Sequence, residues 1–336
     1  SGGVEFDEYA RVLYATDGSI YRAEPAGVVY PTDIDDVRAA VEVATSHGVP
    51  IMPRGTGSSL AGQAVGPGCV VLDVSRHMDD VIDVDPEAQE ATIQPGVVQD
   101  HLDAQLAEHG LKFAPDPASS NRATVGGGIG NNSTGAHSVR YGITDAYTDA
   151  VKAVLADGSL IHAREVVVGS PEWEAIVAKD DREAQVYRTV LDVVRENAAE
   201  IEERYPDLKR RVSGYNLDRV VYENDDGEEV VNLAKLFVGA EGTLGVVVEA
   251  ELSVFKALAN EKRLAVVHAL REGELCACEL ETVLDAPQST VASHLRKLRD
   301  AGIVATRKEG KWTYYRIADT ASLQLLDLAG ALGEDR

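Results

Sequence analysis

Cysteine, aromatic side chains and long hydrophobic runs are all scarce in this chain of 336 residues. Its three cysteines, Cys69, Cys276 and Cys278, are too few for a disulfide framework. Cys276 and Cys278 are only two residues apart, and we expect this separation to be too short for an ordinary structural disulfide. No apolar run approaches the roughly 18 to 20 residues of a membrane helix, and no secretory leader is recognisable at the N-terminus. These absences predict a soluble, cytoplasmic protein. Because the chain begins at Ser1 without a Met, we expect its natural N-terminus to lie upstream.

Basic residues are scarce in only one part of the chain. The formal charge of −24 arises from 56 acidic and 32 basic residues. Residues 255–336 hold 12 of each, which leaves 44 acidic and 20 basic residues for residues 1–254. Such an acidic surface favours solubility or adaptation to high salt over nucleic-acid binding. We therefore expect a halophilic source and two domains, residues 1–254 and 255–336.

The segment from residue 27 to residue 62 predicts a strand, a helix, a second strand and a glycine-rich loop. Thr32 is expected to cap the helix, and Gly48 lies where it should stop. The apolar run Val49 to Met52 predicts the second strand, so the segment forms an α/β unit. The buried helix face should contain the residues at helical spacing, Ile34, Val37, Val41 and Ala44.

The loop PRGTGSSLAG has the chemistry that a pyrophosphate requires. Gly55 and Gly57 lack a Cβ atom, so their N–H groups can approach anionic oxygens, and Thr56, Ser58 and Ser59 add hydroxyl donors. The loop matches neither the P-loop pattern nor a GxGxxG turn that opens a helix. Alone, it fits either a plain surface loop or a ligand cradle.

A second segment, PDPASSNRATVGGGIGNNSTG, is also rich in glycine. Glycines clustered in this way would be poor in the interior of a strand, but they suit a backbone that approaches a flat or phosphorylated ligand. The following VKAVLADGSLI predicts a strand that turns at Asp157-Gly158. Together, the two glycine-rich segments favour a cofactor site.

These segments, followed by SGYNLD and FVGAEGTLGVVVEAEL, resemble the FAD-binding domain of the p-cresol methylhydroxylase (PCMH) and vanillyl-alcohol oxidase type. The likeness is to its D-lactate, glycolate and D-2-hydroxyglutarate dehydrogenase branch. It implies an α+β FAD-binding domain with two α/β subdomains. The residues that it implies for FAD binding are Arg54, Gly55, Thr56, Gly57, Ser58, Ser59, Gly62, Gln63, Pro117, Ser119, Thr124, Gly126, Gly127, Asn132, Gly242, Gly245 and Val247.

The resemblance ends near Val254, where these dehydrogenases continue into a substrate domain that covers the flavin. Without that cover the flavin ring would be open to water, which disfavours proton abstraction and hydride transfer. Tyr215, Asn216 and His137 lie in segments near the expected ring, and we interpret each as structural. The sequence therefore nominates no general base.

The last 82 residues have the pattern of a winged helix-turn-helix. Short helices are expected over Ala277 to Leu284 and Gln288 to Ala301, followed by two strands around Glu309-Gly310. Val291, Leu295 and Leu298 should face the core. The polar and basic residues expected to contact base edges, phosphates or both are Gln288, Ser289, Thr290, Ser293, His294, Arg296, Lys297, Arg307, Lys308 and Lys311.

The segments ALANEKRL, ELCACEL, QSTVASHLRKLRDAGIV and EGKWTYYRI resemble the ArsR/SmtB repressors. That resemblance implies a homodimer that reads a palindromic DNA operator. Cys276 and Cys278 occupy positions where arsenic sensors of this family place paired thiols, which suits a soft ion such as As(III). Glu281 stands where those sensors often have a third cysteine, so the pair fits either a metal site or two small, partly buried residues. Cys69 is expected in the core.

Three functions fit these features. The chain is a DNA-binding regulator with a flavin domain, the remnant of an FAD-dependent 2-hydroxy-acid dehydrogenase, or a fusion of two uncoupled modules. The missing substrate domain disfavours turnover, and the complete helix-turn-helix favours DNA binding.

The acidic excess of residues 1–254 predicts a stability that depends on salt. Screening of like charges should raise the thermal unfolding midpoint as KCl concentration increases. Circular dichroism melts over a KCl series measure this, and a midpoint that stays constant or falls with KCl would refute the halophilic hypothesis.

Overall fold

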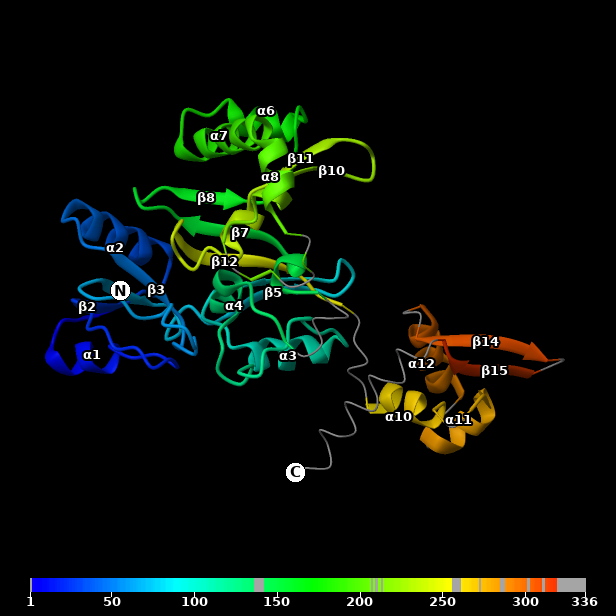
Figure 1. The fold of residues 1–336 in the computed structure, drawn as a ribbon. Helices are drawn as coiled ribbons and strands as arrows, with labels where there is room; N and C mark the ends of the chain where they lie inside the picture. The colour runs from blue at the N-terminus through cyan, green and yellow to red at the C-terminus, as the bar shows by residue number, and fades with distance from the viewer. Residues whose placement is uncertain are drawn as a thin grey trace. The chain divides into compact units, whose positions relative to one another are not determined.

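The computed structural model describes residues 2–135, 142–206, 208, 211–212, 214–255, 261–271, 273–284, 288–300, 303–309 and 312–318. The chain divides into two compact units (Figure 1). One comprises Ser1–Leu106 and Phe113–Phe255, and the other Ala107–Lys112 and Lys256–Arg336. Within the described residues, none of the helices has the length and apolar character needed to cross a membrane.

The first unit begins with a four-stranded sheet in the order β1-β2-β4-β3. Strand β4 runs parallel to both β2 and β3, whereas β1 is antiparallel to β2. The elements are β1 (Gly3–Glu5), α1 (Glu8–Leu13), β2 (Gly27–Tyr30), α2 (Ile34–Ser46), β3 (Ile51–Arg54) and β4 (Val70–Asp73). The expected strand, helix, strand and loop are therefore confirmed, and the glycine-rich loop leaves the carboxyl end of β3.

Helix α2 has the expected buried face but a different cap. Val37, Val41 and Ala44 are buried, and Gly48 follows the helix with φ of +66°. The N-cap is Asp33, whose carboxylate accepts a hydrogen bond from the Asp36 N–H at 2.9 Å. Thr32 instead donates its N–H and hydroxyl to the Asp36 carboxylate. The prediction of Thr32 as the cap was wrong because the adjacent aspartate competes for the same role.

A five-stranded antiparallel sheet forms the second layer of the first unit, in the order β5-β6-β12-β7-β8. Its strands are β5 (Val81–Asp85), β6 (Glu90–Ile93), β7 (Thr148–Val154), β8 (Leu160–Ala163) and β12 (Val246–Ser253). Strand β12 is central, and its residues alternate between buried and half-buried. The predicted turn at Asp157-Gly158 joins β7 to β8, with Gly158 at φ of +81°.

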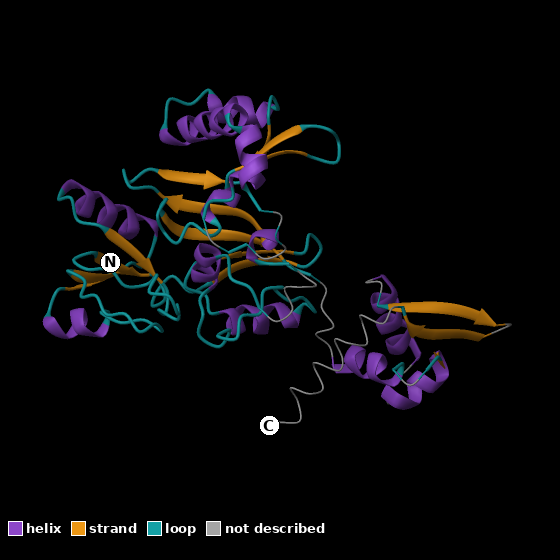
Figure 2. Ribbon diagram, in the orientation of Figure 1, coloured by secondary structure: helices purple, strands orange, loops and turns teal. Residues whose placement is uncertain are grey.

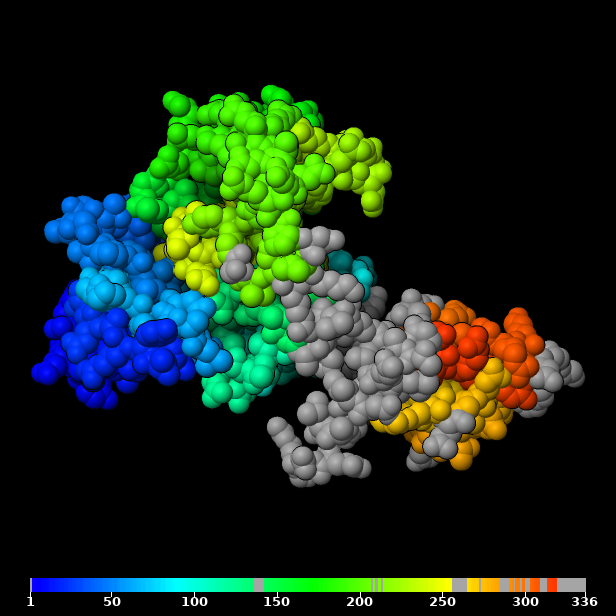
Figure 3. Space-filling model, viewed as in Figure 1, coloured from blue at the N-terminus to red at the C-terminus, as the bar shows by residue number. Residues whose placement is uncertain are grey.

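Helices and a small third sheet complete this unit (Figure 2). The sheet has the order β10-β11-β9. The remaining elements are α3 (Gln99–Glu108), α4 (Val125–Asn131), the 3-10 helix η1 (Thr144–Tyr147), β9 (Glu165–Val167), α6 (Pro171–Val177), α7 (Arg182–Glu196), α8 (Ala198–Arg204), the 3-10 helix η2 (Leu217–Arg219), β10 (Val221–Glu223), β11 (Glu229–Asn232) and α9 (Ala234–Phe237). In Figure 3 the N-terminal segment (blue) and the segment containing α6 and α7 (green) lie on either side of yellow residues around β12.

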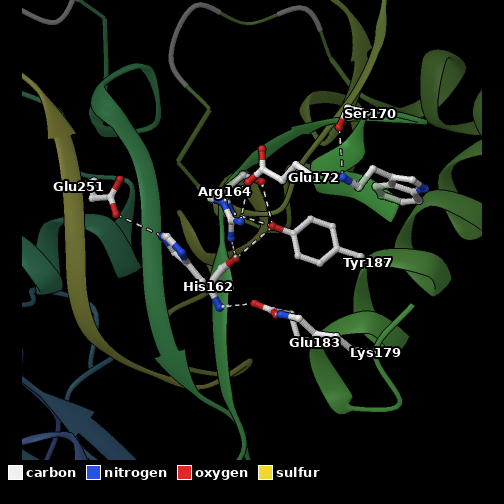
Figure 4. A network of polar contacts seen from close by, with 9 residues as sticks. His162, Arg164, Ser170, Glu172, Lys179, Glu183, Tyr187 and Glu251 are labelled. Carbon is white, nitrogen blue, oxygen red and sulfur yellow. Dashed lines mark hydrogen bonds and ion pairs between the residues drawn. The ribbon is translucent and has the colours of Figure 1, made fainter. Parts of the chain in front are cut away.

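A polar network fastens α7 to the edge strand β8 (Figure 4). The buried Tyr187 hydroxyl accepts from the Arg164 N–H at 3.1 Å and lies 3.0 Å from the His162 carbonyl, to which it donates. Burial raises the pKa of Tyr187 to about 12. The Glu183 carboxylate accepts from the His162 N–H at 3.0 Å. These contacts satisfy main-chain groups at the sheet edge, so we interpret the network as structural.

The second unit has the expected helix and strand order. Its described elements are α10 (Glu261–Ala269), β13 (Leu275–Cys276), α11 (Ala277–Leu284), α12 (Gln288–Asp300), β14 (Val304–Glu309) and β15 (Trp312–Ile317). The strands form an antiparallel sheet in the order β13-β15-β14. Val291, Leu295 and Leu298 are buried in one core with Leu280 and Leu284, as predicted.

Leu72 is expected to be a main contributor to the stability of the first unit. It is completely buried in β4, between the neighbouring strands β2 and β3. Leu72→Ala should reduce the free energy of unfolding by about 2 to 5 kcal/mol because it leaves a cavity. Leu160→Ala is the matched control, since Leu160 on edge strand β8 is 41% exposed. If denaturant unfolding showed the same loss of unfolding free energy for both variants, this placement of the core would be contradicted.

Candidate functional site

One cavity of about 350 Å³ in the first unit collects most of the predicted cofactor residues. Its walls come from the loop after β3, the segment around α4 and the segment from Phe237 to Val247. Predicted residues lining it are Arg54, Gly55, Thr56, Gly57, Ser58, Ser59, Gln63, Ser119, Thr124, Gly126, Gly127, Gly242, Gly245 and Val247. Three segments far apart in sequence therefore meet at a single site.

The loop from Gly55 to Ser59 lines this cavity. Within the described residues, none of its backbone N–H groups donates a hydrogen bond to the protein. Consecutive N–H groups without protein acceptors form a concavity that binds anions. The loop is therefore suited to a phosphate or pyrophosphate.

Arg54 stabilises the base of this loop through hydrogen bonds to main-chain carbonyls. Its guanidinium donates to the carbonyls of Tyr14 at 3.3 Å, Ala64 at 2.8 Å and Thr16 at 2.8 Å. Burial lowers the Arg54 pKa, and the nearby Asp73 carboxylate opposes that shift. A Cβ atom on Gly57 would lie 2.3 Å from the guanidinium, so the glycine lets the loop fold over the arginine. We interpret Arg54 as a positioning residue for the loop.

The glycines of α4 fall into two groups, those that protein packing requires and those that packing does not require. A Cβ atom on Gly126 would meet the Pro95 carbonyl oxygen at 2.7 Å, which explains that glycine by packing. Gly128 and Gly130 line the cavity, and a Cβ atom on either would meet nothing closer than 3.8 Å. Protein packing therefore does not demand glycine at these two positions. Side chains there would instead occupy the cavity, which is expected where a ligand approaches the helix backbone.

Hydrogen bonds join the three wall segments. The Thr56 hydroxyl donates to the Arg122 carbonyl at 2.6 Å. The Gln63 amide donates to the Asn131 side chain at 3.3 Å. The Glu241 N–H donates to the Gly130 carbonyl at 2.9 Å, with Glu241 at φ of +52°. These bonds fix the cavity walls relative to one another before any ligand binds.

Gly62, Pro117 and Asn132 do not line the cavity. Gly62 has φ of +84° and packs against Tyr21. Asn132 is buried, caps α4 in the left-handed conformation, and accepts the Asp145 N–H at 3.1 Å. Gly128, Gly130, Asn131 and Ser133 also line the cavity and belong to the glycine-rich segment that was expected to approach a ligand. Sequence reasoning missed the other lining residues, which are Pro53, Leu60, Ala61, Ala64, Val74, Pro95, Ala123, Phe237, Ala240 and Glu241.

The cavity wall is poor in groups that could transfer a proton. Among its lining residues, all of them in the described part of the chain, only Arg54 and Glu241 are ionisable. The buried Asn216 donates to the Val238 carbonyl at 2.9 Å, and the Tyr215 hydroxyl lies 2.9 Å from the Thr243 hydroxyl. Both contacts agree with the structural role expected from the sequence. His137 lies outside the described residues.

Helix α12 carries the predicted DNA-reading residues of the second unit. Arg296 is exposed, Thr290 and His294 are half-buried, and the opposite face packs into the core. Gln288, Ser289, Ser293 and Lys297 also belong to α12, but their side chains fall outside the described part of the structure. The helix therefore presents at least one exposed cation opposite its apolar face.

The strands β14 and β15 form the predicted wing. Lys308 is exposed on β14. Arg307 is exposed but lies 2.8 Å from the Glu274 carboxylate, and its guanidinium carbon is 5.0 Å from the Tyr314 ring centre. Arg307 therefore also organises the wing, a role that the sequence did not suggest. Lys311 lies outside the described residues.

Cys276 and Cys278 are joined by a disulfide. The expectation that they are too close for a bridge was therefore wrong, because at the beginning of a helix the backbone brings their Cα atoms to 5.5 Å. Neither sulfur is a thiolate in this state, so a soft ion could use only the reduced pair. Within the described residues, no group of three or more metal-ligating side chains is present. Cys69 is free and buried, as expected.

Comparisons with known families agree with both resemblances. Residues 25–164 match the family described as FAD binding domain, and residues 260–306 match the family described as bacterial regulatory protein, arsR family. The N-terminal part thus resembles FAD-binding domains, and the C-terminal part resembles ArsR-type helix-turn-helix domains. Both resemblances inferred from the sequence are confirmed.

Curated relatives are dehydrogenases and oxidase subunits that are longer than this chain. D-2-hydroxyglutarate dehydrogenase from Pseudomonas putida is 36% identical over 81% of this chain, which spans 27% of that protein. The Escherichia coli enzyme of the same name is 33% identical over the same shares. Glycolate oxidase subunit GlcD from Bacillus subtilis is 28% identical over 80% of this chain and 46% of its own length.

Solved structures show the same kind of fold. An alkyldihydroxyacetonephosphate synthase covers 97% of this chain with a TM-score of 0.51, and 55% of that protein is matched. The sequence identity is 17%, so this comparison concerns the fold alone.

Side chains introduced at Gly128 should exclude a ligand without unfolding the protein. Gly128→Phe fills the cavity, whereas Gly128→Ala adds only a methyl group in open space. We expect Gly128→Phe to reduce flavin affinity at least about 100-fold, roughly 3 kcal/mol, and Gly128→Ala to have a smaller effect. Flavin fluorescence titration measures binding, and thermal melts check the fold. Wild-type affinity in a folded Gly128→Phe protein would refute this site.

Proposed function

We propose that the first unit binds FAD in its cavity and that the second unit binds double-stranded DNA, which makes the chain a flavin-containing transcriptional regulator. The observation that carries the cofactor assignment is the loop Gly55 to Ser59, which lines the cavity and whose N–H groups have no acceptor within the described residues. A pyrophosphate matches this row of donors. The open positions Gly128 and Gly130 leave room for the rest of the cofactor. When bound, FAD supplies a centre that accepts or donates two electrons.

The DNA-binding assignment rests on the second unit. It combines the arsR-type match with a helix α12 that is apolar on one face and carries exposed Arg296 on another. Lys308 on the wing adds an exposed cation. Unlike the acidic first part of the chain, residues 255–336 have equal numbers of acidic and basic residues. The positive potential of a local basic face is therefore not cancelled by a net negative charge. We propose a palindromic operator bound by a homodimer, in a soluble cytoplasmic protein of halophilic origin.

A dehydrogenase acting on a D-2-hydroxy acid is the second candidate. It is favoured by the 36% identity to D-2-hydroxyglutarate dehydrogenase. It is disfavoured because the chain spans 27% of that relative and because Arg54 and Glu241 are the only ionisable residues of the described cavity wall. Glu241 is the only carboxylate of the described wall, so the cavity offers a single candidate for the group that would remove the substrate proton. An uncoupled fusion of the two units is the third candidate.

A soft metal or metalloid such as As(III) is proposed only for the reduced Cys276 and Cys278 pair. Such an ion prefers three sulfur ligands, and this pair provides two. A further ligand would have to come from a partner chain or from outside the described residues. Arsenite titration of the reduced protein, with Cys276→Ser as control, tests this proposal by a change in thiol absorbance.

The central experiment combines an absorbance spectrum with a DNA gel shift on the same sample. Purified protein should show a flavin spectrum after reconstitution with FAD, and should shift DNA fragments enriched from a random library. No flavin spectrum would remove the FAD assignment. A regulator should also change its DNA affinity on dithionite reduction, whereas unchanged affinity would favour the uncoupled fusion. Dye reduction that depends on D-lactate or D-2-hydroxyglutarate would favour the dehydrogenase.

Arg296 should contribute to DNA affinity through a phosphate or base contact. Arg296→Ala is expected to weaken binding by about 1 to 3 kcal/mol, or roughly 5- to 150-fold. If the contact is to phosphate, the salt dependence of binding should also become shallower. Arg204→Ala is the control, because Arg204 is an exposed cation of the first unit. Fluorescence anisotropy with the enriched fragment measures both variants, and equal affinities would contradict the assignment.

A further inference from the structure

We propose that the Cys276–Cys278 pair is a reversible thiol–disulfide exchange site for low-molecular-weight thiols and disulfides, and that its state controls DNA binding. The second half of this proposal rests on the DNA-binding function proposed above. The observations that carry it are the disulfide itself and its place in the fold of the second unit. The site differs from the flavin cavity, none of whose lining residues is a cysteine.

The two sulfurs span the junction between a strand and a helix. Cys276 is the last residue of β13 and is 7% exposed, whereas Cys278 is the second residue of α11 and is exposed. A small thiolate can therefore reach the bridge from the Cys278 side. Thiol–disulfide exchange requires this access to one sulfur of the bridge. An exposed disulfide of this kind belongs to the labile class rather than to the buried structural class.

The beginning of α11 also favours the reduced product. The Cys276 N–H donates to the Glu279 carboxylate at 2.7 Å, so Glu279 caps the first turn of the helix. Cys278 lies within that first turn, where the positive end of the helix dipole favours a thiolate. The first turn of α11 would therefore stabilise the thiolate that reduction produces at Cys278, as a reversible switch requires.

The bridge is connected to the proposed DNA-binding wing. Cys276 pairs with Tyr314 of β15, and Tyr314 pairs with Arg307 of β14. Arg307 stacks on the Tyr314 ring and forms an ion pair with Glu274, next to β13. A change in the backbone at Cys276 is therefore transmitted through one strand to the wing. On its other side, α11 packs with α12 in one core through Leu280 and Leu284.

The exchange balances as two successive displacements. The thiolate of one small thiol attacks the Cys278 sulfur, the bond between the two protein sulfurs breaks, and its electron pair leaves on the Cys276 sulfur, which takes up a proton. A second small thiolate attacks the sulfur of the first small thiol in the mixed disulfide and displaces the Cys278 thiolate, which takes up the second proton. The protein gains two electrons and two protons, and the two small thiols are oxidised to one disulfide.

The structure shows the helix-turn-helix assembled with the disulfide formed, and we expect this form to bind DNA more tightly than the reduced form. Reduction removes the crosslink between β13 and α11 and increases the conformational freedom of the backbone where the strand meets the helix. That loss of pre-organisation should weaken binding roughly 5-fold or more, in the range of ordinary coupling between sites.

The test uses the full chain equilibrated with reduced or oxidised glutathione. After unfolding and alkylation, mass spectrometry should count three labelled cysteines in the reduced sample and only Cys69 in the oxidised one. Anisotropy with the enriched DNA fragment then compares the two states. Cys278→Ser should abolish the redox response of DNA affinity, whereas Cys69→Ala should keep it because Cys69 lies in the other unit.

Each outcome decides a different part of the proposal. Three labelled cysteines in the oxidised sample would overturn the exchange site. A disulfide that forms while DNA affinity stays unchanged would overturn its control over binding. Absence of DNA binding in both states, with the thiol counts as expected, would instead remove the proposed DNA-binding function and leave the exchange site standing.

Discussion

The buried guanidinium of Arg54 is the interaction on which the candidate cofactor site depends. Three main-chain carbonyls, those of Tyr14, Thr16 and Ala64, converge on it, and the nearby Asp73 carboxylate partly opposes the lowering of its pKa by burial. Breaking one partner of such a buried arrangement is costly because the remaining charge or carbonyl loses its compensation. The arginine thereby ties the N-terminal segment and the end of β3 to the glycine-rich loop.

The loop conformation follows from this anchor. Gly57 crosses over the guanidinium where a Cβ atom would collide with it, and the residues from Gly55 to Ser59 line the cavity with N–H groups that have no acceptor within the described residues. The wall is thus made mostly of main-chain and uncharged groups, with Arg54 and Glu241 as its ionisable residues. Such a wall suits the binding of an anionic cofactor and offers few groups for proton transfer.

Periodic patterns made much of the fold predictable from the sequence. The apolar face of α2 and the core face of α12 follow the helical period, and the turn at Gly158 follows the Asp-Gly pair. Many residues that line the cavity were predictable because the glycine-rich motifs recur in a known family, but their individual contacts were not. Arg54 carries a charge that suits phosphate, yet only the fold shows that its donors are already engaged. The three-dimensional path of α4 likewise separates Gly126, which packing requires, from Gly128, which packing leaves open.

The cysteine bridge was missed because sequence separation alone says nothing of the backbone turn at the beginning of α11.

The position of β12 has a consequence for how the chain is made. This strand is the last of the first unit in sequence, yet it lies in the middle of its five-stranded sheet, paired with β6 on one side and β7 on the other. During synthesis, β6 and β7 therefore emerge from the ribosome well before the strand that joins them. Until then each exposes an edge that another chain could pair with. Completion of this sheet must wait for the residues immediately before the second unit, so the nascent first unit acquires its native sheet only as translation reaches the helix-turn-helix.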